Sequence, residues 1–260
     1  MAAEQFQLVG LVYAVAGAAV IAYLLATGRF TRRVGYLFLV LSLLLGFLLG
    51  FLNLSPAAPL QFQEVLAGVG RGVYPPLLFL AVILAVFIIV ALMAGRVFCG
   101  YLCPIGAVQE AVSLAPVPKE GTAKVQRYLT LFRLAFLVVL VAAAVLFSTA
   151  LLRFFGVREF FSLEVASAWF FVFLLLLAVA SVIYRPFCRF FCPMGAILAL
   201  AASRARLKLR RTNECTNCGK CDVICPTGEA GKNAKKAECY LCGRCLEVCP
   251  REGALRYGKG

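Results

Sequence analysis

The chain has 260 residues, of which 63% are apolar, and its mean hydropathy is +0.93. This composition is too apolar for one soluble core and predicts an integral membrane protein. The absence of histidine excludes haem ligated by histidine, and the net charge of +14 does not indicate nucleic acid, because Lys and Arg are concentrated in short loops and in the C-terminal tail.

Five apolar runs are long enough to span a bilayer as helices. Backbone polar groups have no water partners in hydrocarbon, and the sequence lacks the alternating pattern of a barrel strand, so we expect α-helices. The predicted fold class is therefore an α-helical membrane protein with a bundle of about five transmembrane helices. The runs cover residues 6–27, 34–53, 76–94, 129–151 and 167–184.

Basic residues in the loops between these runs predict the orientation. Loops rich in Lys and Arg remain in the cytoplasm, so we expect a multi-pass protein of a prokaryotic cytoplasmic (inner) membrane, with the N-terminus outside and the C-terminus inside. Membrane lipid is then a partner, and Arg133 is expected to reach the cytoplasmic surface. The basic loop residues are Arg29, Arg32, Arg33, Arg96, Lys119, Lys124 and Arg127.

Two segments at the ends of the third and fifth runs are copies of each other. They read "GRVFCGYLCPIGA" and "YRPFCRFFCPMGA", and each follows a pair of predicted helices. A parallel repeat of this kind brings its two copies together about a pseudo-two-fold axis. The matched positions are Arg96/Arg185, Phe98/Phe187, Cys99/Cys188, Tyr101/Phe190, Cys103/Cys192, Pro104/Pro193, Gly106/Gly195 and Ala107/Ala196.

The repeat predicts a site with four thiols, Cys99, Cys103, Cys188 and Cys192, which we call the four-thiol site. Residues four apart on a helix share a face, and the following proline ends or bends the helix. We expect these thiols to bind a third metal or redox centre, preferably iron-sulfur, with its charge compensated by Arg96, Arg185 and Arg189. A redox-active dithiol, a Cu(I) site and structural packing are the alternatives.

The tail carries two runs of the form Cys-x2-Cys-x2-Cys-x3-Cys-Pro. This is the bacterial ferredoxin spacing for two 4Fe-4S clusters, whereas zinc sites and disulfides fit the doubled pattern less well. The resemblance to two-cluster ferredoxins implies that the fourth cysteine of each run ligates the other cluster. One cluster would take Cys215, Cys218, Cys221 and Cys249, and the other Cys239, Cys242, Cys245 and Cys225.

The chain is accordingly divided into three parts. Residues 1–200 are predicted to form the transmembrane helical domain with both Cys-x3-Cys-Pro motifs. Residues 201–213 form a basic juxtamembrane linker, and residues 214–260 form the ferredoxin domain with two 4Fe-4S clusters. From residue 201 onward there are 13 Lys or Arg against 6 Asp or Glu, a surplus that could attract an acidic redox partner or simply solvate the tail.

The pairing of two CxxxCPxGA segments with a double 4Fe-4S run resembles the NapH/NosR/CcoG group of membrane-bound polyferredoxin-like proteins. The resemblance covers residues 76–250 and is strongest to the NapH-type quinol dehydrogenase subunit. It implies electron transfer between the quinone pool and a redox partner, within a complex of other redox subunits. NapH-type proteins typically have four spans where five are predicted here, and the large flavin-binding domain of NosR-type proteins is absent from the sequence.

The predicted function is therefore that of an iron-sulfur electron-transfer subunit, with no catalytic residue of the chain's own. Glu159 and Glu164, in an aromatic loop, could accept quinol protons, although such loops also act as membrane anchors. Two alternatives follow from other relatives: a copper reductase or assembly factor of the CcoG type, and a redox-sensing regulator of the NosR type.

Overall fold

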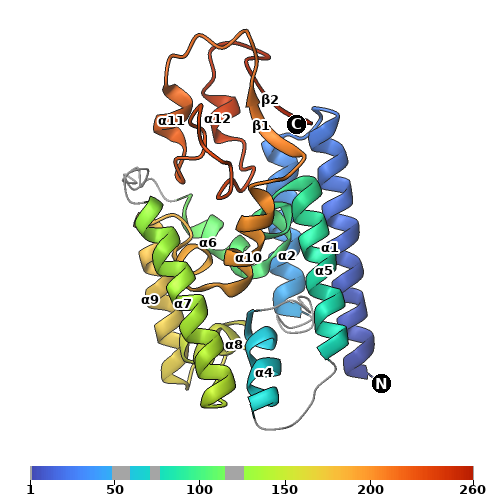
Figure 1. Ribbon diagram of the computed structural model, residues 1–260, viewed down its shortest axis with the longest axis vertical. Helices are drawn as coiled ribbons and strands as arrows, with labels where there is room; N and C mark the ends of the chain where they lie inside the picture. The colour runs from blue at the N-terminus through green and yellow to red at the C-terminus, as the bar shows by residue number, and fades with distance from the viewer. Residues whose placement is uncertain (1, 49–58, 71–76, 115–125, 260) are drawn as a thin grey trace.

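The computed structural model describes residues 2–48, 59–70, 77–114 and 126–259. A body of helices carries a smaller tail that lies at one end of it (Figure 1). The helices of the body are α1 (Ala2–Ala26), α2 (Arg32–Leu48), α4 (Pro59–Gly70), α5 (Leu77–Ala94), α6 (Pro104–Val112), α7 (Gln126–Leu146), α8 (Val157–Phe161), α9 (Ala168–Val182) and α10 (Pro193–Ala202).

The predicted transmembrane bundle is wrong, because no helix in the described part of the chain is both long enough and apolar enough to cross a membrane. A crossing takes about 20 residues, so length alone excludes α2, with 17 residues, and α9, with 15, but not α1, with 25, or α7, with 21. Helix α9 ends at Val182 because Ile183 becomes extended, with φ −103° and ψ 122°. Arg185, with φ 50°, then turns the chain immediately before Pro186.

The same finding overturns the predicted inner-membrane localisation and the orientation derived from the basic loops. Some residues used in that prediction lie outside the described ranges. They are residues 49–53 of the second predicted span, residue 76 of the third, Lys119 and Lys124.

The two halves of the sequence repeat fold alike. In the first half, helix α5 leads through the π-helical turn η1 (Phe98–Leu102) to α6, and in the second, α9 leads through the π-helical turn η3 (Phe187–Phe191) to α10. Gly95, with φ 69°, allows the corner after α5. Helices α6 and α10 lie at the centre of the body directly beneath the tail, so the repeat presents both motifs to it (Figure 1).

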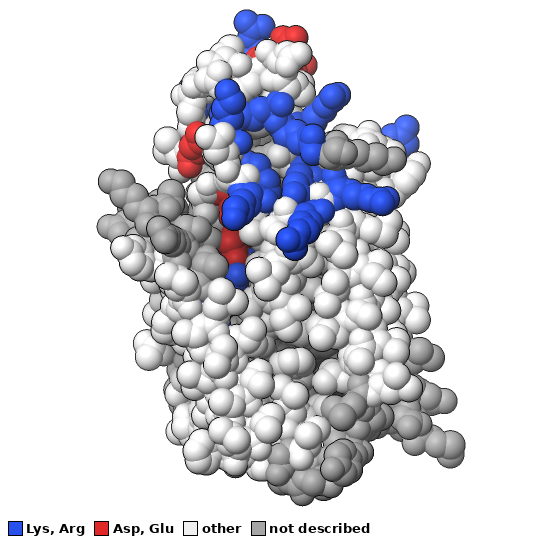
Figure 2. Space-filling view, viewed as in Figure 1, with Lys and Arg blue, Asp and Glu red and all other residues white. Residues whose placement is uncertain are grey.

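The tail contains a two-stranded antiparallel sheet and two short helices. Strand β1 (Leu207–Arg211) pairs with β2 (Leu255–Lys259), and helices α11 (Lys220–Ile224) and α12 (Arg244–Glu247) carry cysteines of the two runs. Strand β1 lies within the stretch predicted to be a basic linker, so part of that stretch belongs to the tail's own sheet. Figure 2 shows Lys and Arg gathered over the junction between the tail and the body.

Candidate functional site

Both Cys-x3-Cys-Pro motifs have the same backbone form. The amide of Cys103 donates to the carbonyl of Phe98 at 2.9 Å, and the amide of Cys192 donates to Phe187 at 3.0 Å. These bonds span five residues, and such π turns are frequent at functional sites. Each second cysteine then becomes extended and caps a helix that begins with proline.

This geometry places a thiol at the N-terminus of α6 and of α10. The Sγ atom of Cys192 accepts a hydrogen bond from the amide of Gly195 at 3.3 Å. Burial raises the pKa of the Cys103 thiol, and the backbone amides of Ile105 and Gly106 oppose this rise. Amides at a helix N-terminus stabilise negative charge, so both positions suit thiolates better than an ordinary core position would.

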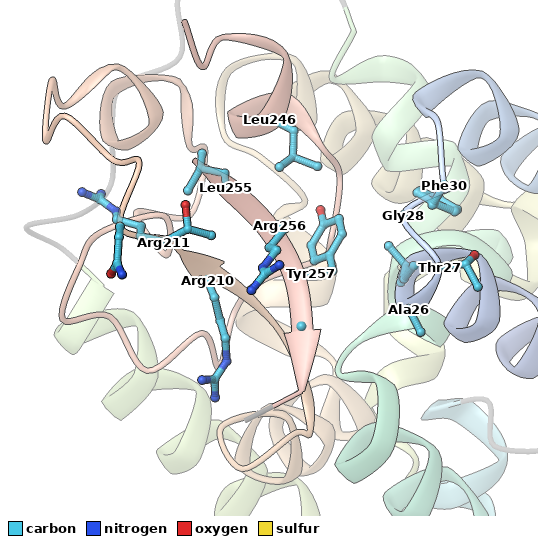
Figure 3. Close-up of a pocket in the computed structure, with 14 residues that line it drawn as sticks. Ala26, Thr27, Gly28, Phe30, Arg210, Arg211, Leu246, Leu255, Arg256 and Tyr257 are labelled. Carbon is cyan, nitrogen blue, oxygen red and sulfur yellow. The ribbon is translucent and has the colours of Figure 1, made fainter. Parts of the chain in front are cut away.

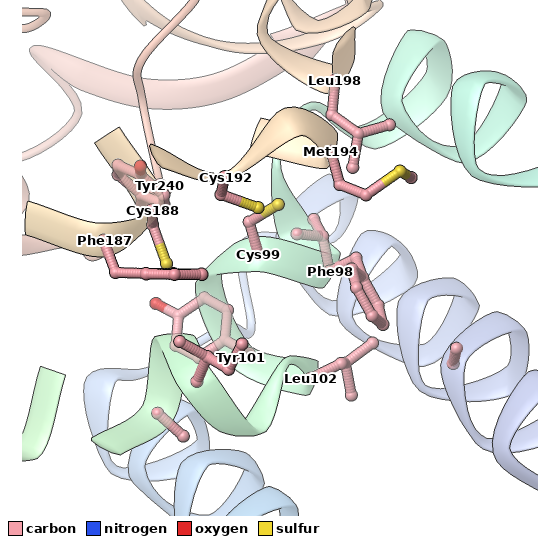
Figure 4. Packing of buried hydrophobic residues seen from close by; sticks show 14 of the residues in the cluster. Phe98, Cys99, Tyr101, Leu102, Phe187, Cys188, Cys192, Met194, Leu198 and Tyr240 are labelled. Atoms are coloured by element: carbon pink, nitrogen blue, oxygen red, sulfur yellow. The ribbon is translucent and has the colours of Figure 1, made fainter. Parts of the chain in front are cut away.

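The repeat brings the four predicted thiols into one part of the core. Cys99, Cys188 and Cys192 are buried in the main apolar cluster, and Cys103 packs against it. Figure 4 shows the thiols of Cys99 and Cys192 directed toward each other, with Cys188 beside them. The sequence prediction that the two motifs meet is thus matched by the positions of these residues.

Burial disfavours the charged form of these thiols. It raises the pKa of Cys188 to about 11, against the lowering effect of the Arg185 guanidinium. Burial also raises the pKa of Cys103 and of Cys192, and in each case neighbouring thiols of the group add to the shift. Thiolates at this site would therefore need a cation, and a metal centre is one that a group of soft sulfur ligands can bind.

Two arginines cross between the halves of the repeat. Arg185 donates to the carbonyl of Cys99 at 2.5 Å and to that of Gly100 at 2.9 Å. Its counterpart Arg96 reaches the other motif. Its Nη2 atom lies so near Gly195 that a Cβ atom added there would be 3.2 Å away. Each guanidinium therefore lies against the backbone of the opposite motif.

The site fits an iron-sulfur centre in one respect that does not depend on the cysteine pattern. Arg96 is 1% exposed, and its Nε and Nη2 atoms have no hydrogen-bond partner among the described residues. Cys99 and Cys188 are close enough to act on its pKa. Buried donors without partners are costly, and an anionic centre held by the four thiolates would offer acceptors to them.

Tyr240 of the tail contacts the arginines of the four-thiol site. Its ring contacts two guanidinium groups: the ring centroid lies 4.2 Å from the Cζ atom of Arg96 and 4.6 Å from that of Arg185. The side chain is 3% exposed. A tail residue therefore completes the wall of the four-thiol site, next to the tail cysteines Cys239 and Cys242.

Two buried carboxylates hold the tail on the body. Glu238 contacts Arg96 at 2.6 Å and Arg133 at 2.7 Å. Glu110 contacts Arg185 at 3.0 Å and the tail residue Arg244 at 2.7 Å. Such buried pairs depend on good geometry, since each charge has lost its hydration.

Sequence reasoning missed this network. Arg133 was expected to reach the surface, but its side chain is buried, at 4% exposed, and is paired with Glu238. The sequence offered only a weak indication of the two carboxylates. Glu110 is an isolated acidic residue beside the first motif, and Glu238 immediately precedes Cys239. Arg189 is also buried and acts on the pKa of Glu238.

Four of the eight tail cysteines line one cavity. Cys225, Cys239, Cys242 and Cys245 line one cavity together with Tyr184, Tyr240 and Tyr257. This is the set implied for one cluster, and its Cys242 also lines a second, small cavity with Glu110 and Arg185 of the body. The other set includes Cys218, which is exposed, and Cys221, whose Sγ lies 3.4 Å from Arg211.

All twelve cysteines are free thiols. In the described part of the chain, no group of three or more Cys, Asp or Glu side chains is arranged to hold a single metal ion. Glu159, considered as a quinol contact, lies in α8 and has a buried Oε2 atom without a hydrogen-bond partner among the described residues. Glu164 is exposed.

Comparison with known proteins agrees with these cysteine patterns. A family described as a 4Fe-4S binding domain matches residues 76–122 and residues 165–212, which are the two halves of the repeat. The methylamine utilization ferredoxin-type protein MauN of Paracoccus denitrificans is 29% identical, over 69% of this chain and 63% of its own length. The putative electron transport protein YccM of Escherichia coli is 26% identical, over 56% and 45%.

A third relative, the protein NirI of Paracoccus denitrificans, is 32% identical over 52% of this chain but only 22% of its own length. The matches cover less than two thirds of the length of each of these relatives. No solved structure matches the chain.

Proposed function

We propose that this chain is an iron-sulfur electron-transport protein of the NapH-like, ferredoxin-type family and that it transfers electrons between a quinol and a protein redox partner. Three groups of cysteines hold its centres: the four-thiol site, the inner tail group and the outer tail group. The inner tail group is Cys225, Cys239, Cys242 and Cys245, and the outer tail group is Cys215, Cys218, Cys221 and Cys249. Iron-sulfur clusters supply one-electron transfer when bound.

One observation carries this proposal: the segment with Cys239, Tyr240 and Cys242 is packed directly on the four-thiol site. Tyr240 contacts Arg96 and Arg185, and both of these act electrostatically on Cys188. The inner tail group is therefore adjacent to the body, while the outer tail group includes the exposed Cys218. The cysteines form a series from the core of the body to the surface of the tail.

The surrounding residues prepare the four-thiol site for negative charge and keep water out. Arg96 and Arg185 are 1% exposed, and Phe187 of the second motif is fully buried. In a dry environment a guanidinium acts strongly on a nearby anion. These arginines would thus favour the more negative, reduced state of a centre held by the four thiolates.

Quinol is proposed as the two-electron reactant because of the family relationship and because Glu159 offers a proton acceptor. Its buried Oε2 atom lacks a partner among the described residues. Phe155, which precedes α8 in the chain, contacts Phe187 of the second motif, with 5.7 Å between the ring centroids. The protein partner is proposed to be acidic, in view of the basic junction in Figure 2.

The test is an anaerobic redox titration of the purified protein followed by EPR. We expect signals from three centres, and we expect a short-chain quinol to reduce at least one of them. Replacement of Glu159 by Gln should slow reduction by quinol while leaving reduction by dithionite unchanged. If no quinol reduces any centre, the quinol role is wrong, and if no iron-sulfur signal is assigned to the four-thiol site, the three-centre arrangement is wrong.

A further inference from the structure

A cavity of about 800 Å³ lies between the sheet of the tail and the turn that joins α1 to α2. Figure 3 shows this turn, labelled at Ala26, Thr27, Gly28 and Phe30, across from the strand residues Arg256 and Tyr257. Its volume is in the range of small-molecule sites. The proposed electron transfer does not use it.

The described residues that line this cavity include three arginines and no acidic residue. The arginines are Arg210 and Arg211 of β1 and Arg256 of β2. The remaining wall is mixed, with Thr212 and Asn213 on the polar side and Leu25, Phe30 and Leu246 on the apolar side. The lining suits an anion that also has an apolar portion.

The pairing of the strands gives an independent indication of an anion. Arg210 and Arg256 are direct cross-strand partners in the antiparallel ladder, so their side chains lie on the same face of the sheet. Like charges at opposed positions are destabilising. Neither arginine has an acidic side chain within 4 Å in the described ranges, whereas Arg211 is paired with Asp222 at 2.8 Å.

We propose that this cavity binds a phosphate group, held between Arg210 and Arg256. Guanidinium groups present planar sets of N–H donors that match phosphate oxygens, and two opposed groups can hold one phosphate from both sides. The phosphate could be free or part of a lipid headgroup. The apolar wall formed by Leu25, Phe30 and Leu246 would contact the remainder of a lipid, which an inorganic ion does not have.

The site lies beside the outer tail group. Arg211 lines the cavity, and its Nη2 atom lies 3.4 Å from the Sγ of Cys221 and 3.0 Å from the carbonyl of Ala230. An anion bound in the cavity therefore approaches a residue in contact with a predicted cluster ligand. Occupancy should lower the reduction potential of the outer centre, because negative charge nearby disfavours the reduced state.

The experiment measures thermal unfolding of the cluster-loaded protein with added inorganic phosphate, and with dihexanoyl phosphatidylglycerol below its critical micelle concentration. Sodium chloride at the same ionic strength is the reference. Binding to the folded state raises the melting temperature in a saturable manner. We expect Arg256→Gln to weaken the apparent affinity for phosphate by about tenfold or more, and we expect the same of Arg210→Gln.

Arg204→Gln is the matched control, because Arg204 is exposed, lies outside the cavity and carries the same charge. It should leave the phosphate effect unchanged. Without ligand, Arg256→Gln should melt no lower than the wild type, since it removes a repulsion.

Tighter binding of the short-chain lipid than of inorganic phosphate assigns the site to a headgroup, and equal or weaker binding assigns it to free phosphate. The proposal is overturned if chloride produces the same shift, if neither probe produces one, or if the shift survives in Arg256→Gln and Arg210→Gln.

Discussion

At the scale of single residues, Tyr240 is the contact between the tail and the four-thiol site whose loss should be most informative. Its ring faces Arg96 and Arg185, and its hydroxyl has no hydrogen-bond partner among the described residues. Tyr240→Leu should lower the free energy of unfolding by at least about 2 kcal/mol, because desolvated cation–π contacts of that size are lost. Tyr240→Phe keeps the ring and should be nearly neutral in denaturant unfolding.

An equal loss in both variants would contradict this account of Tyr240, because it would assign the stabilisation to the hydroxyl. The reduction potential gives a second measurement. Tyr240→Leu should shift the potential of the four-thiol centre, because the two guanidinium groups beside it are no longer held in place.

Glu238 illustrates the difference between a buried and an exposed ion pair. Glu238→Gln leaves Arg96 and Arg133 buried without their carboxylate, and we expect it to cost about 3 kcal/mol of unfolding free energy. Glu247→Gln is the matched control, since Glu247 pairs with Arg32 at the surface. The control should cost less than about 1 kcal/mol. Similar losses in the two variants would mean that the buried network does not hold the tail.

Glu110 makes part of the stability depend on pH. Burial favours the neutral carboxyl, but Arg185 and Arg244 outweigh it and lower the pKa of Glu110 below 4.5. The unfolded chain therefore binds a proton at a higher pH than the folded one, so the contribution of Glu110 is present above about pH 4.5 and is lost as the pH falls further.

The measurement compares wild type with Glu110→Gln between pH 7 and pH 4 under anaerobic conditions. The difference in unfolding free energy should be largest at neutral pH and should shrink as the pH falls toward the folded pKa. A difference that stays constant or grows in acid would contradict the assignment of an ionised Glu110.

At the scale of secondary-structure elements, the π turn η1 allows the tail to approach closely. A Cβ atom at Gly100 would lie 2.6 Å from the carbonyl oxygen of Tyr240, so Gly100→Ala must displace the backbone of the tail. Amide hydrogen exchange over residues 238–242 should become at least about tenfold faster, as expected when docking loses about 1.4 kcal/mol.

Gly231→Ala is the control for this experiment, because its added Cβ atom would meet only ordinary contacts, the nearest at 3.7 Å. It should leave the exchange rates over residues 238–242 unchanged. Unchanged exchange in Gly100→Ala as well would show that the close approach does not limit docking.

At the scale of the whole molecule, the sequence was most informative where a motif is repeated. The repeat predicted that Cys99 and Cys188 meet, since matched motifs after matched helices have equivalent places. The sequence did not predict the π turns. No residue type in the two motifs distinguishes a hydrogen bond to the fifth preceding residue, as at Cys103 and Cys192, from the α-helical bond to the fourth. Nor did it predict the pairs of Glu110 with Arg244 and of Glu238 with Arg133, which join residues more than 100 positions apart.

The predicted membrane crossing was the largest error. Hydropathy marks where apolar residues occur but not where a helix ends. Helix α9 ends at Val182, and Ile183 is extended, so the predicted span 167–184 becomes the 15 residues of α9. Part of the apolar composition surrounds the buried thiols, with Leu140, Leu152 and Phe173 fully buried in the same core. Other large apolar side chains of the body are exposed, among them Leu37, Leu78 and Leu175.

The central claim is that the four-thiol site holds an iron-sulfur centre, and an iron count tests it most directly. Iron and acid-labile sulfide are measured in the anaerobically purified wild type and in a variant with Cys99→Ser and Cys188→Ser, which leaves the eight tail cysteines intact. The account predicts a fall from about twelve to about eight iron atoms per chain, as one 4Fe-4S centre is lost. An unchanged iron content, with the wild type at about eight, would contradict it.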